Sequence, residues 1–381
     1  MYREAFTIPC SIIRGGTSKG IYFLENSLPA PGPMRDKVIL AAFGSPDQRQ
    51  IDGLGGANSL TSKVCIIGPS NREDADVDYT FGQVSVDKAI VDWKGNCGNL
   101  SSGVGIFAIN NNLLKPVEPE TTVRIYNTNT DKIIHVTYPV RDGRALSNGD
   151  YRIPGVPGTG ARLIVKFFEP SGSITGKLLP TGNVKDIIEV SGHGRFTVSI
   201  VDAGNPVVFL KPNEIGLKGT ELPTEVESMP EVLKLIESIR SIAAEMIGIV
   251  KDRSLATSTS PAYPKIGFVS EPQDYKNPEG ALIKKENVDI TARLCSMQKM
   301  HRAYMVTGAI CTGAASKIPG TLVYEAMSKR ARESDTLLIG MPYGPMEVIT
   351  DERKGQIISG GVYRTARQIL DGSVFIPESR L

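Results

Sequence analysis

The sequence predicts an α/β (α+β) protein made of two similar halves. The chain has 381 residues, of which 40% are hydrophobic and 22% charged, so it can bury two domain-sized cores. Strand-like runs dominate both halves, and each half also contains one short helix-like stretch rich in Gly, Ala and Ser. Because strands, a small-residue helix and further strands follow one another twice, without a tandem repeat of fixed period, we expect two related domains.

The first 140 residues are predicted to be mainly strands. The strand-like runs cover residues 11–16, 20–24, 63–68 and 76–86, followed by a hairpin over 121–140 whose centre, NTNTD, is typical of a turn. Between them, NLSSGVGIFAINNN (99–112) places Val104, Phe107 and Ala108 at helical spacing. That spacing predicts a short buried helix.

The second half begins after an interrupted stretch. Pro and Gly recur through 153–182, so we place the domain boundary at its end. A strand series follows at 195–210, and the apolar spacing of PEVLKLIESIRSIAAEMIG (230–248) predicts an amphipathic packing helix that starts at Pro230. Residues 264–270 are expected to form a strand, 308–320 are a second small-residue stretch, and TARQIL (365–370) is predicted to be a short helix.

Composition excludes several classes of function. With 43 basic and 41 acidic side chains, well mixed, the net charge of +2 offers no patch for nucleic acid or for a membrane surface, so the expected partner is a small molecule. The N-terminal stretch resembles neither a signal peptide nor a spanning helix, which predicts a cytoplasmic protein. Five scattered cysteines are expected to be reduced thiols, and three separated histidines give no expectation of a metal site.

Cys97 is the first candidate for chemistry. It stands between two Gly-Asn pairs in VDWKGNCGNLSSGVG (91–105), directly before the predicted helix. A thiol at the N-terminal end of a helix is favoured as a thiolate, and glycines allow the backbone to approach a ligand closely. The alternative is an ordinary small apolar residue next to a turn.

Lys63 is the second candidate. It follows the glycine- and hydroxyl-rich stretch GLGGANSLTS (53–62) and leads into the apolar run Val64 to Ile67. A lysine at such a position, partly removed from water, can accept a proton near neutral pH. A solvated residue at a strand edge is the alternative, and spacing alone does not decide between them.

Three turns could hold an anion. RGGTSKG (14–20) offers backbone N–H groups and the hydroxyls of Thr17 and Ser18, but it lacks the spacing of a P-loop. GNPVVF (204–209) and CTGAAS (311–316) are similar, and a helix starting near Thr312 would direct its N-terminus at a carboxylate. No dinucleotide fingerprint, GxSxG elbow or metal signature occurs, so these parts suit proton transfer without a cofactor, next to a carboxylate.

Several blocks of the sequence together resemble the 2-methylaconitate cis-trans isomerase (PrpF-like) family, whose members act on aconitate, 3-methylitaconate and 4-oxalomesaconate. The blocks are IPCSIIRGGTSKGIYF, FGSPDQRQIDGLGGANSLTSKVCII, GNCGNLSSGVGIFAI, ATSTSPAYPKIGFV, SMQKMHRAYMVTGAICTGAASKIPGT and YRTARQILDG. The similarity runs in order from about Ile8 to about Pro377, and the TSK and GNCGN blocks are specific in combination.

The resemblance implies the diaminopimelate epimerase-like fold. Two similar domains would each wrap a curled, mainly antiparallel sheet around a central helix, with the active site in the cleft between them. The N-terminal domain would comprise 1–182, completed by 358–381, and the C-terminal domain 183–357.

The resemblance also implies roles for named residues. Lys63 would be the general base that removes a proton next to a double bond, and Cys97 would donate a proton or hold the intermediate. The substrate carboxylates would be bound by residues that present N–H or O–H donors or lie next to them: Thr17, Ser18, Asn58, Gly98, Asn99, Leu100, Asn205, Cys311, Thr312 and Gly313. The expected reaction is a double-bond shift or cis-trans change in a small unsaturated di- or tricarboxylate, without cofactor or metal.

Two alternatives stay open at this point. Diaminopimelate epimerases use two opposed cysteines, so Cys97 and Cys311 could form a two-thiol racemase or epimerase pair; a non-catalytic carboxylate-binding paralogue is the other alternative. The sequence does not choose among aconitate, 2-methylaconitate, 3-methylitaconate and 4-oxalomesaconate, and a homodimer is expected only from the general habit of such enzymes. His301 and Arg293 are left outside the predicted site.

Overall fold

The chain forms two compact units in the computed structural model, which describes residues 5–93 and 95–381. Unit 1 holds the chain up to residue 166 together with 363–381, and unit 2 holds 167–362. The chain passes from one unit to the other within β9 (Leu163–Phe168) and returns within β20 (Gln356–Arg364). The expectation that the active site lies between two domains stays a prediction.

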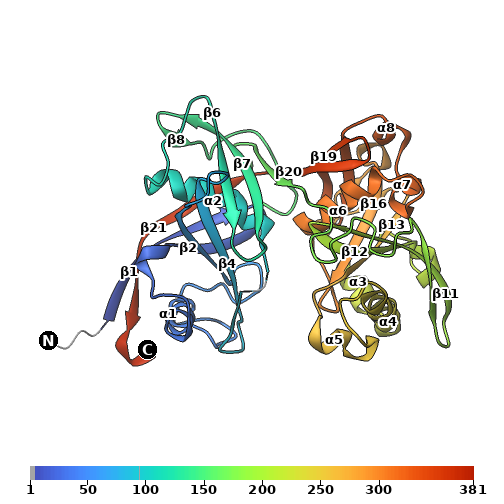
Figure 1. The fold of residues 1–381 in the computed structure, drawn as a ribbon, viewed down its shortest axis with the longest axis horizontal. Coiled ribbons are helices and arrows are strands. Elements are labelled where there is room, and N and C mark those ends of the chain that lie inside the picture. Colours follow the sequence, from blue (N-terminus) through green and yellow to red (C-terminus); the bar gives the residue numbers. More distant parts are fainter. Residues whose placement is uncertain (1–4, 94) are drawn as a thin grey trace. The chain divides into compact units, whose positions relative to one another are not determined.

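Unit 1 builds a curled sheet around one helix (Figure 1). Its strands in spatial order are β21–β1–β2–β3–β4–β6–β7–β9, and the pairs β2/β3 and β4/β6 are parallel. The helix α2 contacts β1, β2, β3, β7 and β21 and is buried along nearly its whole length. The elements are β1 (Ala5–Gly15), β2 (Ser18–Leu24), α1 (Pro33–Phe43), β3 (Lys63–Pro69), β4 (Val77–Val84), β5 (Val91–Asp92), α2 (Gly98–Asn110), β6 (Glu120–Asn127), β7 (Lys132–Arg141), β8 (Arg144–Ala145) and β21 (Ala366–Pro377).

Unit 2 repeats this plan. Its strand order is β10–β11–β12–β13–β16–β18–β19–β20, and the parallel pairs, β12/β13 and β16/β18, stand at the same places. The buried helix α6 contacts β11, β12, β18 and β19. The elements are β10 (Asp186–Val190), β11 (Gly194–Ala203), β12 (Asn205–Leu210), α3 (Pro223–Glu227), α4 (Pro230–Met246), α5 (Ala256–Thr259), β13 (Lys265–Ser270), β14 (Tyr275–Lys276), β15 (Leu282–Ile283), β16 (Ile290–Ser296), β17 (Lys299–Met300), α6 (Val306–Ser316), α7 (Leu322–Ala326), α8 (Lys329–Arg332), β18 (Thr336–Met341) and β19 (Gly344–Arg353).

These two units confirm the predicted fold class of two similar halves, each a mainly antiparallel sheet around a central helix. The small residues of α2 have a packing reason. A Cβ added to Gly105 would lie 2.2 Å from a ring carbon of Tyr138, and one added to Gly103 would lie 2.5 Å from the Tyr22 hydroxyl. A helix enclosed by its own sheet has to be thin, which is why its sequence is rich in Gly and Ser.

The outer helices cover the sheets. The predicted amphipathic helix is confirmed as α4, whose apolar face packs Ile236, Ile239 and Ala243 against the core of unit 2. In unit 1, α1 packs Val38, Ile39 and Phe43 into the corresponding core. Over residues 5–93 and 95–381, none of the helices combines the length and the apolar character needed to cross a membrane.

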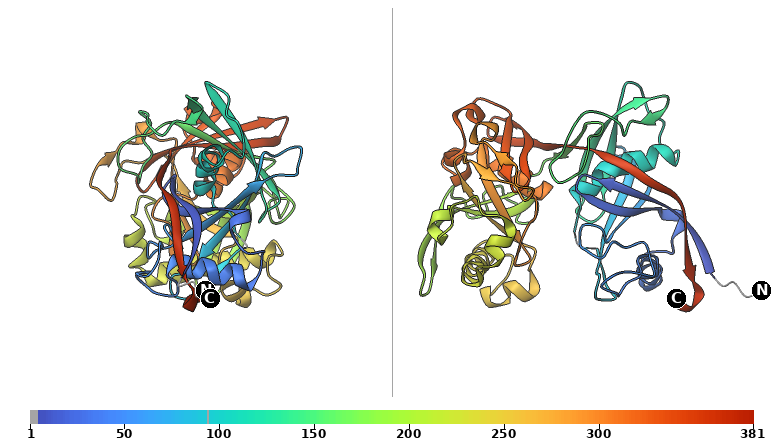
Figure 2. Two further views of the ribbon diagram at one scale, coloured as in Figure 1. Left: turned by 90° about the vertical axis from the view of Figure 1, so that its left-hand side faces the viewer. Right: turned by 180° about the vertical axis from the view of Figure 1, so that it is seen from behind.

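One predicted element is wrong. TARQIL was expected to be a helix, but Ala366–Pro377 forms β21, which pairs antiparallel with β1 from Ala5↔Pro377 to Gly15↔Ala366. Figure 2 shows the two terminal strands side by side. The long open edge of β1 supplies ladder hydrogen bonds that outweigh the weak helical preference of six residues.

Candidate functional site

Lys63 is the first residue of β3 and is 8% exposed. The antiparallel register of β3 and β4 places it directly opposite Gln83, and its Nζ donates to Gln83 Oε1 at 2.5 Å. The ammonium also lies 5.1 Å from the centre of the Phe81 ring. A buried lysine normally pairs with a carboxylate, whereas here the hydrogen-bond acceptor is a neutral amide.

The amide of Gln83 is fixed from its other end. Its Nε2 donates to the carbonyl of Ser62 at 2.8 Å and to that of Ser59 at 3.3 Å, so its oxygen has to face Lys63. Gln83 therefore connects the tip of Lys63 to the loop that leads into β3.

The same loop is organised by Gln50 and Asn58. Gln50 is buried and donates to the hydroxyls of Ser45 (2.8 Å) and Ser62 (2.7 Å) while accepting from the Ala57 N–H. The side chain of Asn58 is exposed and accepts from the Leu60 N–H at 2.9 Å, which closes a turn. Loop 45–62 thus has a defined shape up to the base of Lys63.

Cys97 is the N-cap residue of α2, as the sequence predicted. Its side chain is half-buried, and its carbonyl accepts the first helical hydrogen bond, from the Ser101 N–H at 3.0 Å. The next three residues are Gly98, Asn99 and Leu100, whose N–H groups begin the helix and have no acceptor within it. A thiol and several donors are therefore gathered at one helix end, where negative charge is favoured.

Asn99 connects this helix end to the turn between β1 and β2. Its Nδ2 donates to Thr17 Oγ1 at 3.1 Å, and its Oδ1 accepts from Arg364 Nε at 3.1 Å. Ser18, on the same turn, is buried. Only glycine fits at position 16, because its φ is +52° and a Cβ there would lie 2.2 Å from Asn99 Oδ1.

Arg364 adds a buried positive charge to this turn. The residue is 6% exposed, and desolvation lowers the pKa of its guanidinium to about 10, with a smaller opposing contribution from Tyr151. It stays a cation at neutral pH. The side chains of Thr17, Asn99 and Arg364, which we call the Asn99 cluster, thus combine a cation, an amide and a hydroxyl in unit 1.

Unit 2 has a corresponding turn and helix end. Gly204, at φ +72°, makes the turn between β11 and β12, and Asn205 Nδ2 donates to Thr307 Oγ1 at 2.5 Å. Thr307 is the second residue of α6, just as Asn99 is the second residue of α2. In both units a hairpin turn is thus tied to the start of the central helix by an asparagine and a threonine.

The predicted start of the second helix near Thr312 is wrong. The helix α6 begins at Val306, so Cys311, Thr312 and Gly313 lie in its interior. Cys311 is fully buried, its Sγ donates to the Val201 carbonyl at 3.1 Å, and desolvation holds the pKa of its thiol well above the usual range. The residue at the N-cap of α6, the position that Cys97 occupies in α2, is Met305.

Thr312 and Gly313 contribute packing and helix hydrogen bonds. Thr312 Oγ1 donates to the Gly308 carbonyl at 2.8 Å and lies 3.0 Å from the Tyr304 hydroxyl. A Cβ at Gly313 would lie 2.5 Å from Thr350 Oγ1. Their predicted location at the start of a helix is therefore corrected to the helix interior, and their predicted contact with a substrate stays a prediction.

Tyr22, Cys65 and Tyr79 form a buried group close to Lys63 and Cys97. Burial raises the pKa of all three side chains, and for Cys65 the charge of Lys63 opposes this slightly. All three are therefore neutral near pH 7.

Arg293 and His301 have structural partners. The fully buried guanidinium of Arg293 donates to the carbonyls of Thr220, Glu221, Ala292 and Gly340, which accounts for its burial. His301 Nδ1 accepts from the Ala303 N–H at 3.2 Å. Leaving both outside the predicted site agrees with these contacts.

Sequence reasoning missed Gln83, Arg364 and Thr307. The contact of Gln83 with Lys63 depends on the register of β3 and β4. The contact of Arg364 with Asn99 depends on the return of the chain to unit 1. Thr307 could have been found by comparing the two helix starts, GNCGNL and YMVTGA, had the beginning of α6 been known.

Comparison with known proteins supports one family throughout the chain. The model of the family described as "PrpF protein" matches residues 5–377. The chain is 46% identical to 3-methylitaconate isomerase of Eubacterium barkeri, with 99% of each chain covered. It is 39% identical to 2-methyl-aconitate isomerase of Shewanella oneidensis, again over 99% of each.

Solved structures agree with this result. A crystal structure of methylitaconate-delta-isomerase superposes with a TM-score of 0.90 at 45% identity, covering 99% of this chain and 97% of that one. A hydroxyproline epimerase from Agrobacterium vitis matches with a TM-score of 0.54 at 12% identity, over 98% of this chain and 93% of that one. The second likeness concerns the fold alone and agrees with the epimerase-like plan of the two units.

Proposed function

The chain belongs to the PrpF family, and on that premise we propose that it is an isomerase of a small unsaturated di- or tricarboxylate that needs no cofactor. The reaction is a 1,3-shift of a double bond or a cis-trans change. The candidate substrates are 2-methylaconitate, 3-methylitaconate and aconitate, the first two of which occur in the names of relatives at 39% and 46% identity.

The observation that carries this proposal is the setting of Lys63. Its ammonium is buried against an aromatic ring and bonded to a neutral amide, with no ion pair to a carboxylate among residues 5–93 and 95–381. A carboxylate partner would stabilise the ammonium form by its negative charge, whereas the neutral amide of Gln83 contributes no such charge. Only the neutral amine accepts a proton, so activity is expected to rise with pH.

We assign the proton abstraction to Lys63. It takes a proton from the carbon next to the double bond, and the electron pair spreads over the double bond and the conjugated carboxylate. Return of a proton at the far carbon completes the shift, while rotation before reprotonation changes cis to trans. The dienolate-like intermediate carries extra negative charge on its carboxylate, so fixed donors lower the barrier.

The donors that we assign to the substrate carboxylates are the Asn99 cluster and the start of α2. Arg364 contributes a positive charge and Thr17 a hydroxyl group. The N–H groups of Gly98 to Leu100 contribute hydrogen-bond donors that point out of the N-terminus of α2. Cys97 lies at the same helix end and acts as a proton donor or holds the intermediate. Ser18, Asn58 and Asn205 complete the proposed binding set.

The two-thiol epimerase is the less well supported reading. Its second thiol, Cys311, is enclosed in α6 and bonded to a backbone carbonyl. The position equivalent to Cys97 holds a methionine, which cannot exchange a proton.

A proton NMR time course tests the proposed function. The purified protein is offered 3-methylitaconate, 2-methylaconitate and cis-aconitate separately in deuterated buffer. We expect the vinyl signals of one of them to convert to those of its isomer, with deuterium entering the allylic position. If all three stay unchanged while a chiral amino or hydroxy acid exchanges its α-proton, the epimerase reading replaces this one.

A further inference from the structure

Unit 1 holds a cavity on the loop between β8 and β9. The cavity has a volume of about 520 Å³ and is lined by Asp150, Tyr151, Arg152 and Arg162. The loop is closed by its own backbone, because Tyr151 and Gly160 exchange two hydrogen bonds, of 3.1 and 2.9 Å, and the Ala161 N–H donates to the Ser147 carbonyl at 3.0 Å. The lining residues are therefore positioned by contacts within unit 1.

The guanidinium of Arg162 lies over two aromatic rings. Its central carbon is 4.8 Å from the ring centre of Tyr363 and 6.0 Å from that of Tyr151, and the two rings meet edge-on with their centres 5.8 Å apart. Throughout the described ranges, 5–93 and 95–381, the N–H groups of Arg162 make no hydrogen bond and no ion pair. A guanidinium held over aromatic faces keeps the edge of its planar fork available to a carboxylate.

Arg72, in the same unit, shows the contrasting arrangement. Its guanidinium lies 4.5 Å from the ring centre of Tyr126, but its donors are bonded to the carboxylate of Asp74 at 2.7 and 2.9 Å. Asp150 lines the same cavity as Arg162 and forms no ion pair with it within the part of the chain that the structure describes. The donors of Arg162 are thus left for a ligand, whereas those of Arg72 are occupied.

The cavity is connected to the Asn99 cluster through Tyr363. This residue directly precedes Arg364, whose Nη1 donates to the Tyr363 carbonyl at 2.7 Å and whose Nε donates to Asn99 Oδ1. The phenol of Tyr151 is also close enough to act on the pKa of Arg364, which it raises against the larger, opposite effect of desolvation. One residue therefore contacts the guanidinium of Arg162 with its ring and that of Arg364 with its carbonyl.

We propose that this cavity, which we call the Arg162 cavity, binds one carboxylate group of a small polycarboxylate. The guanidinium of Arg162 donates two parallel hydrogen bonds to the carboxylate, and Arg152 adds positive charge. Asp150 opposes the anion, but two arginines outweigh one aspartate. The inference rests on the proposed function for the class of ligand and adds a binding site to it.

The carboxylate has two possible sources with the same chemistry. It belongs either to the substrate, whose other end is held by the Asn99 cluster, or to a separate polycarboxylate molecule. Both sources require only residues of unit 1.

The test measures binding without turnover. The probe is tricarballylate, a saturated tricarboxylate with no double bond to isomerise, and calorimetric titration of the full chain gives its affinity and the number of molecules bound. We expect R162M to weaken binding at the Arg162 cavity at least about tenfold, the scale of a hydrogen bond to a charged group. Wild-type binding in a folded R162M, or no binding by the wild type, would overturn the proposal.

The number of bound molecules distinguishes the two sources. One molecule per chain, bound more weakly by both R162M and R364M, means that a single ligand spans both arginines. Two molecules per chain, of which R162M affects one and R364M the other, mean that the Arg162 cavity takes a separate molecule.

Two variants in unit 1 control the experiment. R72M removes an arginine that also lies over a tyrosine but is bonded to Asp74, so it should leave the affinity unchanged. D150N removes the negative charge from the lining and should strengthen binding about threefold. An effect of R72M as large as that of R162M, or weaker binding by D150N, would show that the anion does not occupy the cavity.

Failure of this proposal and failure of the proposed function give different results. A wild-type protein that isomerises its substrate in the NMR time course, while R162M binds tricarballylate as the wild type does, keeps the proposed function and loses the Arg162 cavity as a site. Folding of each variant is checked by its thermal midpoint, which should change little because Arg162, Arg72 and Asp150 are exposed.

Discussion

The hydrogen-bond acceptor beside Lys63, the base that we propose, is a neutral amide, and a charged acceptor in its place should change the pH dependence of activity. Replacing Gln83 by Glu puts a carboxylate where the amide oxygen lies 2.5 Å from Nζ. A carboxylate favours the ammonium, so the rising limb of kcat/KM against pH should move up by about one pH unit or more. Titratable neighbours on the adjoining elements are Tyr22, Cys65, Tyr79, Asp92 and Cys97.

The matched control for this variant is Q83M, which keeps the length of the side chain and removes the acceptor. This variant should reduce kcat at every pH without moving the rising limb of the pH profile to higher pH. A pH profile of Q83E that coincides with that of the wild type would show that Gln83 does not govern the protonation of Lys63.

Arg364 should act on substrate affinity rather than on turnover. R364M removes the buried charge next to Asn99 and leaves Asn99 Oδ1 without its 3.1 Å donor. We expect KM for the carboxylate to rise about tenfold or more, the scale of 1.5–3 kcal/mol for a hydrogen bond to a charged group, with kcat within a few-fold. Steady-state kinetics checks this.

R293M is the contrasting variant, because the buried guanidinium of Arg293 donates to four backbone carbonyls and lies over the Tyr275 ring. It should lower the thermal midpoint. An unchanged KM in R364M would show that Arg364 does not contribute to substrate binding.

For individual residues, the sequence indicated which side chains are candidates for chemistry but not which side chains contact one another. Lys63 and Cys97 could be selected because glycine-rich and hydroxyl-rich neighbours mark them locally. Gln83 is 20 residues from Lys63 and Arg364 is 265 residues from Asn99, so both contacts depend on strand register and chain return. Periodicity within one segment holds no information about either.

The elements were predicted best where a pattern is local and strong. The helix α4 follows its apolar spacing, and α2 follows the change from Gly-Asn pairs to small apolar residues. The start of α6 was placed six residues too late because GAICTGAAS is small and apolar on every side and has no capping signal. The strand β21 was missed because its edge partner, β1, lies at the other end of the chain.

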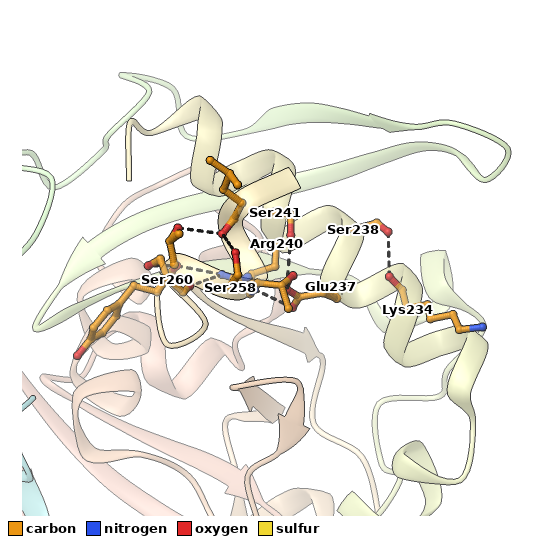
Figure 3. Close-up of polar contacts among 11 residues, drawn as sticks. Lys234, Glu237, Ser238, Arg240, Ser241, Ser258 and Ser260 are labelled. Atoms are coloured by element: carbon orange, nitrogen blue, oxygen red, sulfur yellow. Dashed lines mark hydrogen bonds and ion pairs between the residues drawn. The ribbon is translucent and has the colours of Figure 1, made fainter. Parts of the chain in front are cut away.

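The hydrogen bonds of Glu237, on α4 (Figure 3), should make the free energy of unfolding depend on pH. Although desolvation raises it, the pKa of Glu237 is lowered overall by its hydrogen bonds with Arg240 and Thr257. A lowered carboxyl pKa stabilises the fold above the unfolded value of about 4.3 and loses this effect as pH falls through the folded value. E237Q should therefore lower the free energy of unfolding by about 2 kcal/mol at pH 7 and by progressively less below pH 4.

Urea unfolding of the wild type and E237Q from pH 3.5 to 7 measures this difference. E231Q is the matched control on the same helix, because Glu231 and Lys234 form an exposed pair that is worth little. A difference in free energy of unfolding between wild type and E237Q that stays constant down to pH 3.5 would contradict the proposed coupling between the protonation of Glu237 and stability.

For the whole molecule, the return of the chain to unit 1 is a requirement of folding. The strand β21 pairs with β1 along its entire length, and Arg364 precedes it. Deleting 366–381 should expose the β1 edge and the apolar side chains beneath it, so unit 1 should become sensitive to protease while unit 2 stays protected.

Deleting only 378–381 leaves β21 complete and is the control for this truncation. Limited proteolysis with mass spectrometry distinguishes the two cases. Equal protection of unit 1 in both truncated chains would mean that β21 is dispensable.

The repeat of one strand plan in two units could be predicted from the order of strands and small-residue helices, but its detailed correspondences could not. Lys63 and Lys265 correspond because they begin β3 and β13, which lie in matching parallel pairs. Cys97 and Met305 correspond because they are the N-cap residues of α2 and α6. The two halves share too little sequence in these segments to align them by residue type.

The central claim is that Lys63 removes the substrate proton without help from a cofactor. It is tested most directly by the rate at which solvent deuterium enters the allylic carbon of an isomerised substrate, measured by NMR for wild type and K63M after dialysis against a chelator. We predict rapid incorporation by the wild type, unchanged by the chelator, and a loss of at least about 100-fold in K63M with the fold intact. Incorporation by K63M at the wild-type rate would contradict the account.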